Sequence, residues 1–150
     1  MSKTVIQLMA AIVALFAGLS TGAAGAAELK VLSTEAMRPM LEELAPAFEA
    51  ASKNKLVIAY ASDADVAKTV ASDESIDIAI MTKAAMDKLV KSARILTATK
   101  VLATGASPDL VYVVGSSFFT EQPLAATALV DFLGGPEAKK VYAAKGLKTS

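Results

Sequence analysis

After residue 27, the spacing of apolar residues switches repeatedly between two patterns. Short, almost uninterrupted apolar runs occupy 29–32, 55–60, 76–81 and 110–114. Runs of this length, with no polar alternation, are typical of strands buried on both faces. A further extended segment is predicted within 95–103. The chain is therefore expected to contain four or five strands.

Apolar residues spaced three or four positions apart separate these runs and predict helices. The first helix is predicted to start near Glu35, where Ser33 and Thr34 offer capping hydroxyls. Pro46 lies inside this helix and is expected to bend or split it, because proline lacks a backbone donor and crowds the preceding turn. The buried stripe of this helix consists of Met37, Leu41, Leu44 and Phe48.

The later helices have recognisable starts and stops. Residues 62–65 have the spacing of a capping box, and Thr82 is predicted to cap the next helix. Two more helices are predicted to begin at Pro123 and Pro136, and Gly146 has the pattern of a left-handed helix stop. The residues predicted to face inward from the three helices after residues 62, 82 and 123 are Val66, Ala67, Val70, Met86, Leu89, Val90, Ala93, Ala125, Ala128, Leu129, Phe132 and Leu133.

Three strand-to-helix units in succession predict the fold class. Parallel strands with right-handed crossovers place helices on both faces of the sheet. We therefore expect an α/β fold, a three-layer sandwich with a mostly parallel sheet of four or five strands. Residues 28–150 are expected to form this single domain.

The first 27 residues predict an export signal. Lys3 is the only charge before Glu28, an apolar run covers 5–19, and small residues follow, so cleavage is expected near Ala26 or Ala27. The alternative is an uncleaved membrane anchor, because 4–27 carries no charge and is just long enough to span a bilayer. With cleavage, the mature protein is periplasmic and has no membrane span.

Composition narrows the possible functions. The chain has 15 Lys and Arg against 15 Asp and Glu, and no Cys or His. A neutral balance gives no long-range attraction for phosphate backbones, so nucleic acid is not an expected partner. Without Cys and His, the chain has no thiol or imidazole nucleophile, no disulfide and no zinc site built on those ligands.

The remaining chemistry-bearing residues do not form a catalytic pattern. No glycine-rich phosphate loop follows any predicted strand, and the S-x-x-K match at 52–55 lacks partner motifs. Five acids could be drawn as a metal site, but they read better as cap, turn and strand residues: Asp63, Asp65, Asp73, Glu74 and Asp77. We therefore predict a protein that is not an enzyme, with no cofactor and no metal.

A ligand site is expected where the predicted parallel strands end. Ligands of open α/β sheets bind beyond the carboxyl ends of the strands, where helix N-termini point free N–H groups outward. The residues at those ends are Ser33, Thr34, Ser62, Asp63, Met81 and Thr82. The alternative is that the hydroxyl groups only cap their helices.

Several phrases together resemble one protein family. They are LKVLS at 29–33, LEELAPAF at 41–48, IDIAIMT at 76–82, and the tail ALVDFLGGPEAKKVY at 128–142 with KGL at 145–147. Following a signal peptide, they are similar to periplasmic solute-binding proteins of ABC transporters, most of all to the molybdate-binding type.

The resemblance implies a two-lobed receptor that encloses its ligand between the lobes. Here only 95–124 separates the head and tail phrases, which is too short for a second lobe. We therefore expect a single lobe of a periplasmic-binding-protein-like fold. Its partners would be a small-molecule or ion ligand and either an ABC-transporter membrane component or a second lobe supplied in trans.

Carboxylates at the predicted site bear on the ligand. Molybdate-type receptors hold their oxyanion with hydroxyl and backbone N–H groups, and the resemblance puts Ala36 and Asp63 where two serines are expected. Glu35 adds a second negative charge. These acids repel a dianion and use the positive end of the helix dipole, so they disfavour molybdate. The alternative is that both are ordinary first-turn acids.

Two functions from different classes remain open. The first is a non-catalytic extracytoplasmic lobe that binds a small solute or an oxyanion-like ligand at the strand ends. The second is an interaction or vestigial scaffold that docks a partner protein or another copy of itself. Phe118 and Phe119 bear on this choice, because two adjacent aromatic residues after a strand do not easily both face one core.

Overall fold

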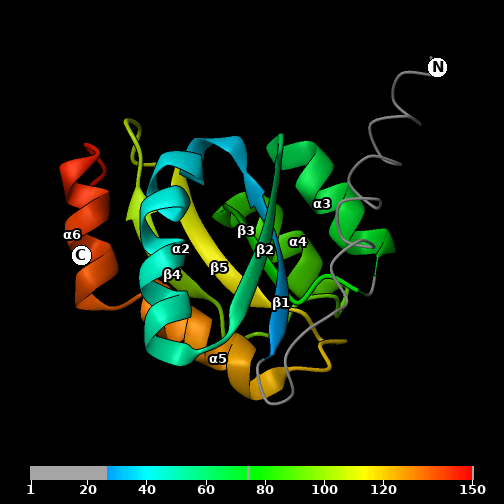
Figure 1. Ribbon diagram of the computed structural model, residues 1–150. Helices are drawn as coiled ribbons and strands as arrows, with labels where there is room; N and C mark the ends of the chain where they lie inside the picture. The colour runs from blue at the N-terminus through cyan, green and yellow to red at the C-terminus, as the bar shows by residue number, and fades with distance from the viewer. Residues whose placement is uncertain (1–26, 74, 150) are drawn as a thin grey trace, which may run out of the picture.

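The computed structural model describes residues 27–73 and 75–149, in which five strands form one sheet with the order β2-β1-β3-β5-β4 (Figure 1). The strands are β1 (Glu28–Thr34), β2 (Lys55–Ala61), β3 (Ile78–Thr82), β4 (Lys100–Thr104) and β5 (Val111–Ser116). β1 runs parallel to β2 and β3, whereas β5 is antiparallel to both β3 and β4. The predicted mostly parallel sheet is confirmed, with β5 as the one reversed strand.

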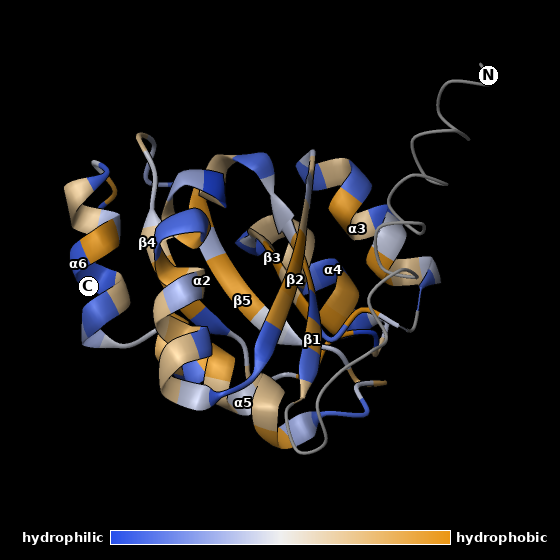
Figure 2. Ribbon diagram, in the orientation of Figure 1, coloured by the Kyte–Doolittle hydropathy of each residue, from blue (hydrophilic) through white to orange (hydrophobic). Residues whose placement is uncertain are grey.

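Helices cover both faces of this sheet, which confirms the three-layer α/β fold. They are α2 (Arg38–Ser52), α3 (Asp63–Ser72), α4 (Lys83–Lys91), α5 (Pro123–Leu133) and α6 (Pro136–Ala144). The hydrophobic core on one face joins the sheet to α2, α5 and α6, and the core on the other face joins it to α3 and α4. Figure 2 shows largely hydrophobic strands between helices that carry both hydrophilic and hydrophobic residues.

The central strand β3 explains why the predicted strands are continuously apolar. Ile78 and Ile80 are buried beside α2, α5 and α6, while Ala79 and Met81 are buried beneath α3 and α4. Both faces of the strand are buried, so neither the odd-numbered nor the even-numbered residues need polar side chains.

Some local predictions are wrong. The helical segment does begin at Glu35 as predicted, but as a short 3-10 helix (η1, Glu35–Met37) that leads into α2, and the predicted split at Pro46 is wrong because Pro46 lies inside a continuous α2. Ala93 is exposed because α4 ends at Lys91 and Ala93 adopts a left-handed backbone with φ 57°. Ala128 and Ala67, also predicted to face inward, are exposed and partly exposed respectively.

The predicted stop after α6 is confirmed. Gly146 has φ 87°, and the Leu147 N–H donates to the Tyr142 carbonyl over 3.0 Å. The chain then runs beside β4, where Lys148 and Thr104 exchange two backbone hydrogen bonds of 2.8 and 2.9 Å. The end of the chain therefore partly covers the outer edge of β4.

The connection from β4 to β5 is a short turn rather than a second lobe. It spans 105–110 and is closed by a hydrogen bond from the Gly105 N–H to the Leu110 carbonyl, over 2.8 Å. In the described part of the chain, no helix is long and apolar enough to cross a membrane. The predicted signal peptide lies outside the described residues, apart from Ala27.

Candidate functional site

Parallel pairing brings the predicted site residues to one edge of the sheet. Thr34 lies opposite Ala61 in the β1–β2 register, and Ser33 lies opposite Ile80 in the β1–β3 register. The three strands therefore end side by side, and the starts of η1, α3 and α4 follow directly. We call this the carboxyl edge of the sheet.

The two residues at the end of β1 are largely hidden. Ser33 is fully buried, and its hydroxyl donates to the Thr34 carbonyl over 3.0 Å. Thr34 is 6% exposed and precedes η1 without a capping hydrogen bond from its side chain. The prediction that these hydroxyls cap the helix is wrong, because the Ser33 hydroxyl donates to the Thr34 carbonyl and the Thr34 hydroxyl makes no capping hydrogen bond.

Asp63 and Thr82 form the main polar contact of the carboxyl edge. One Asp63 carboxylate oxygen accepts the Thr82 backbone N–H over 3.0 Å, and the other accepts the Thr82 hydroxyl over 2.5 Å. Asp63 begins α3 and Thr82 immediately precedes α4, so the contact links the N-termini of two helices. The prediction that the Thr82 hydroxyl caps α4 is wrong, because this hydroxyl donates its hydrogen bond to Asp63.

The other two predicted residues have different surroundings. The Ser62 hydroxyl accepts the Asp65 backbone N–H over 3.2 Å and donates to the Asp65 carboxylate over 2.8 Å, so its capping role is confirmed. The Met81 side chain is fully buried beneath α3 and α4. Only the backbone of Met81 is available at the carboxyl edge.

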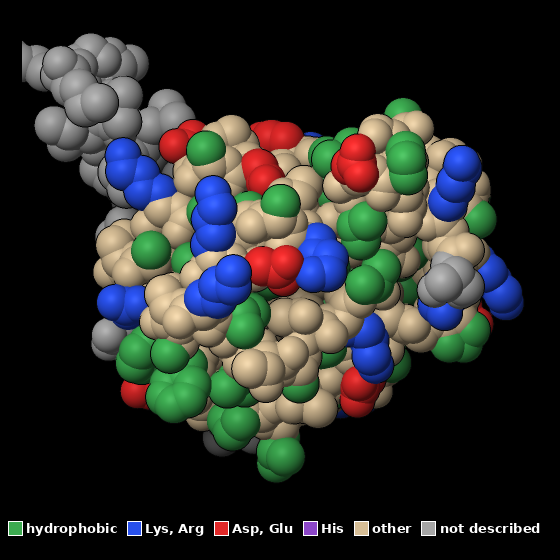
Figure 3. Space-filling model, turned by 180° about the vertical axis from the view of Figure 1, so that it is seen from behind, with side chains coloured by type: hydrophobic (Ala, Val, Ile, Leu, Met, Phe, Trp, Pro, Cys, Tyr) green, Lys and Arg blue, Asp and Glu red, His purple; other side chains and the backbone are tan. Residues whose placement is uncertain are grey.

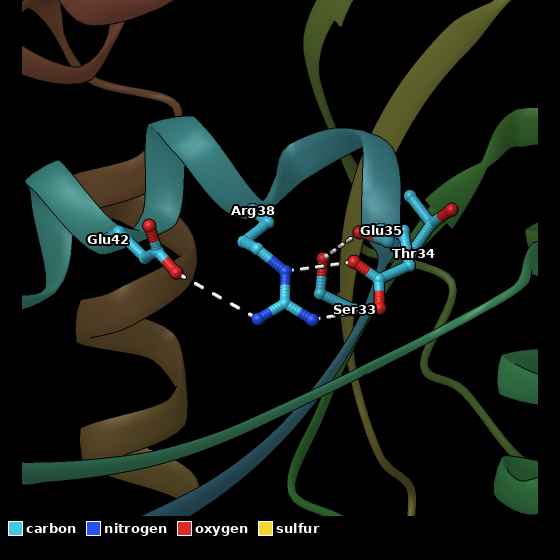
Figure 4. Close-up of polar contacts among 5 residues, drawn as sticks. All are labelled: Ser33, Thr34, Glu35, Arg38 and Glu42. Atoms are coloured by element: carbon cyan, nitrogen blue, oxygen red, sulfur yellow. Dashed lines mark hydrogen bonds and ion pairs between the residues drawn. The ribbon is translucent and has the colours of Figure 1, made fainter.

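Arg38 supplies positive charge near this edge and is already paired (Figure 4). Its guanidinium donates two hydrogen bonds of 2.8 Å to the Glu35 carboxylate and lies 3.9 Å from Glu42. It also lies 4.2 Å from the centre of the Tyr60 ring. The hydrogen bond from Arg38 lowers the pKa of Glu35, and the same contact raises the pKa of Arg38.

Sequence reasoning missed this cluster. Its signal is the spacing of Glu35, Arg38 and Glu42, which puts opposite charges three and four residues apart on one helical surface. Because all three side chains are well exposed, these ion pairs lie on the surface and do not form a buried anion-binding site.

The negative charge of Asp63 also affects Tyr112, which lies on β5. Tyr112 lies opposite Thr82 in the β3–β5 register, and its pKa is raised first by burial and then by the Asp63 carboxylate. With Asp63 and Glu35 at this edge and Arg38 already paired, the arrangement accepts hydrogen bonds more readily than it attracts an anion.

Two hollows lie at the opposite edge, where β1 begins. Volumes of about 470 and 440 Å³ open on either side of Glu121 and Gln122, with Phe119 lining the first and Leu124 the second. Asp77 lines the first hollow, yet it is only 8% exposed. It accepts the Lys30 N–H over 2.9 Å and the Thr120 hydroxyl over 2.6 Å, which gives it a structural role.

No metal-binding group is formed by the acids that the structure describes. Within 27–73 and 75–149, no three His, Cys, Asp or Glu side chains gather closely enough to hold a metal ion. Of the five acids considered in the sequence, Glu74 lies outside those ranges. On the face seen in Figure 3, Lys and Arg side chains are interspersed with Asp and Glu, in keeping with the chain's neutral balance of charges.

The family model described as "bacterial extracellular solute-binding protein" matches residues 29–107, which span β1 to the end of β4. The chain belongs to this family. No protein of curated function matches the sequence.

Several solved structures share the fold of the chain. The substrate-binding domain of a putative molybdenum ABC transporter from Clostridium difficile superposes with a TM-score of 0.75 at 10% identity, covering 83% of this chain and 100% of that one. The periplasmic molybdate-binding protein of Azotobacter vinelandii gives 0.74 at 11% identity, covering 81% and 99%. The tungstate ABC transporter protein of Geobacter sulfurreducens gives 0.64 at 12% identity, covering 78% and 98%.

These comparisons confirm the resemblance drawn from the sequence. The chain is a member of the solute-binding family with the α/β fold of molybdate-type proteins, and its described residues form one sheet. The family is one of solute-binding proteins, and the first two of these structures are a substrate-binding domain of an ABC transporter and a molybdate-binding protein. The identities of 10 to 12% extend this likeness to the fold only, so the ligand must be argued from the residues of this chain.

Proposed function

We propose that the chain is a non-catalytic, extracytoplasmic solute-binding lobe of an ABC transporter, exported after cleavage near Ala26 or Ala27. Its binding surface is the carboxyl edge, where Ser62, Asp63 and Thr82 are at least partly exposed, and which also includes the buried Ser33 and Thr34 and the backbone of Met81. Family membership supports the solute-binding role, and the meeting of three strand ends with the starts of α3 and α4 supports this position.

The Asp63–Thr82 contact carries the proposal for the ligand class. The carboxylate already takes the Thr82 N–H and hydroxyl, which are donors that an incoming oxyanion would need. The carboxylate would also repel a dianion, by about 4 kcal/mol for each pair of unit charges 4 Å apart at an intermediate dielectric. The site therefore favours a small solute that donates hydrogen bonds, such as an amine, over molybdate.

The carboxyl edge offers only one wall of a binding cleft. A small ligand on a single open surface keeps much of its hydration, and tight sites bury most of the ligand. We infer that the opposite wall comes from a second lobe in trans or from the membrane component of the transporter. On this view the isolated lobe binds its solute weakly.

A ligand panel on purified protein tests the proposal. We expect ethanolamine and related amines to raise the unfolding temperature of the wild type, and molybdate, tungstate, sulfate and phosphate to leave it unchanged. A ligand present at 100 times its Kd stabilises the folded state by about 2.7 kcal/mol, which is ample for detection. Divalent cations are tested separately. If they raise the unfolding temperature as much as the amines do, the response reflects positive charge alone.

Asp63→Asn sharpens the test because asparagine keeps an acceptor for the Thr82 N–H but removes the negative charge. We expect this variant to lose the amine response and gain one to oxyanions. Asp65→Asn is the matched control, since Asp65 lies in the same first turn of α3 and makes no contact with Thr82. A molybdate shift of the wild type as large as that of Asp63→Asn would overturn the proposed ligand class.

A second candidate function rests on exposed aromatic side chains. Phe118 is 60% exposed and Phe119 39%, with ring centres 5.6 Å apart in an edge-to-face arrangement. Such a pair suits a scaffold that docks a protein partner. If docking is the function, Phe118→Ser should weaken capture of that partner while the ligand panel stays silent. A ligand response that is unchanged by Phe118→Ser would favour the solute-binding lobe.

A further inference from the structure

We propose that the outer edge of β2 binds β2 of a second copy of this chain, in an antiparallel pair centred on Ile58. β2 is at the end of the sheet order β2-β1-β3-β5-β4, and its only strand partner is β1 among the residues described (Figure 1). The backbone groups that would pair lie along β2 and are not part of the proposed ligand site, although Asp63 belongs to that site and also follows the end of β2.

The backbone of β2 defines which groups face outward. The Lys55 N–H donates to the Ala27 carbonyl over 2.8 Å, on the side of β1. Because successive residues of a strand point their N–H and C=O groups to opposite sides, those of Leu56, Ile58 and Tyr60 point away from β1. Within 27–73 and 75–149, no residue hydrogen-bonds to these outward backbone groups.

The outward backbone groups of these three residues can hydrogen-bond to the same groups of a second copy. In an antiparallel pair, outward-facing residues directly opposite each other exchange both N–H···O bonds. With Ile58 opposite Ile58 of the second copy, Leu56 lies opposite Tyr60 and Tyr60 lies opposite Leu56. Every outward group is then used, and the two-fold symmetry closes the assembly at two chains.

Side chains on the same strand support this register. Leu56, Ile58 and Tyr60 are only partly buried against α2 and the core on that face, so pairing would remove more of their apolar surface from water. Figure 2 shows β2 as hydrophobic along most of its length, with a hydrophilic start at Lys55.

Charge at the two ends of β2 also fits an antiparallel pair. The exposed Lys53 and Lys55 stand at its start, whereas Asp63 and Asp65 follow its end. Reversing the second copy brings each basic end beside an acidic end, while a parallel pair would put like charges together.

The opposite edge of the sheet is poorly suited to the same contact. β4 has a register shift between Val101 and Ala103, begins with Lys100, and is paired at Thr104 with Lys148. Bulges, lysines and covering segments are the means by which proteins protect an edge strand. β2 has no proline and no charged residue between Leu56 and Ala61, and its register with β1 is unbroken.

The oligomeric mass of the protein purified after export tests this interface. We expect a mass that rises with concentration from one chain to two and no further. Ile58→Pro removes an outward N–H that has no partner among the residues described, together with part of the packing of Ile58 against the core. Because both copies carry the substitution, one N–H···O bond is lost on each side of the two-fold axis. We therefore expect the dimer Kd to rise at least about tenfold. Ile58→Val is the matched control and should dimerise like the wild type.

A charge reversal keeps the test informative if Ile58→Pro fails to fold. Lys55→Glu should weaken the dimer, because it removes positive charge from the end of β2 that lies beside the acidic end of the second copy, whereas Lys55→Arg keeps the charge and should dimerise like the wild type. The proposal is overturned if the wild type stays a monomer at every concentration, or if Ile58→Pro folds and dimerises unchanged. Masses beyond two chains would likewise overturn the two-fold register.

Discussion

Two aspartates at opposite edges of the sheet make nearly the same hydrogen bonds in different surroundings. Asp63, at the carboxyl edge, accepts a backbone N–H over 3.0 Å and a threonine hydroxyl over 2.5 Å. Asp77, near the start of β3, accepts a backbone N–H over 2.9 Å and a threonine hydroxyl over 2.6 Å. The bonding alone does not distinguish a structural carboxylate from one available to a ligand.

Burial and connectivity make the difference. Asp77 is 8% exposed and joins β1 to the segment after β5, where its own backbone also bonds to Lys30 and Ser117. Asp63 is partly exposed and joins only the starts of α3 and α4. Asp77 is the more buried of the two carboxylates, so we expect water or a solute to replace the partners of Asp63 more easily than those of Asp77.

The largest expected effect comes from Asp77→Ala. The change removes the largely buried carboxylate that accepts both the Lys30 N–H and the Thr120 hydroxyl and so joins two distant segments. We expect the free energy of unfolding to fall by about 3 kcal/mol, measured by urea denaturation. Asp73→Ala is the control, since Asp73 accepts bonds only from neighbouring Ser75. An equal loss in both variants would contradict the structural role of Asp77.

Asp63→Ala should cost less, about 1 kcal/mol, because water can reach the Thr82 donors that it uncovers. The same urea experiment compares it directly with Asp77→Ala. If Asp63→Ala proved the more damaging of the two, the carboxyl edge would be a structural joint, and the distinction between the two aspartates would fail.

The smallest expected effect is spectroscopic. The Asp63 carboxylate contributes, after burial, to the raised pKa of Tyr112, so Asp63→Asn should move that pKa down toward the ordinary tyrosine value. Burial remains, so the shift is incomplete. Absorbance titration of tyrosinate, with Tyr112→Phe to assign the signal, measures it. Asp77→Asn should not change the pKa of Tyr112. An equal shift in that variant would contradict the assignment of the effect to Asp63.

The regular elements of this fold could be predicted from the sequence because they depend on local spacing. The apolar runs correspond to β1, β2, β3 and β5, and Met37, Leu41, Leu44 and Phe48 are all buried as the helical stripe predicts. The stop at Gly146 depends equally on nearby residues. Such features require only that each segment bury one or both faces.

The polar contacts could not be predicted because they join distant segments. Asp63 and Thr82 are 19 residues apart, and Asp77 and Thr120 are 43 apart, so their contacts depend on strand order. The sequence correctly puts Asp63 and Thr82 at the carboxyl edge but treats the threonine as a cap. Likewise, no local pattern reveals that β2 would be an edge strand or that β5 would be reversed.

The pairing of Thr104 with Lys148 has a consequence for proteolysis of the protein. Cleavage of the chain just before Lys148 would remove the segment that pairs with β4 and would leave α6 and its stop intact. If β2 pairs with a second copy as proposed, the cleaved protein would have an unprotected strand at each edge of the sheet, and further copies would then add to the proposed pair as a fibre.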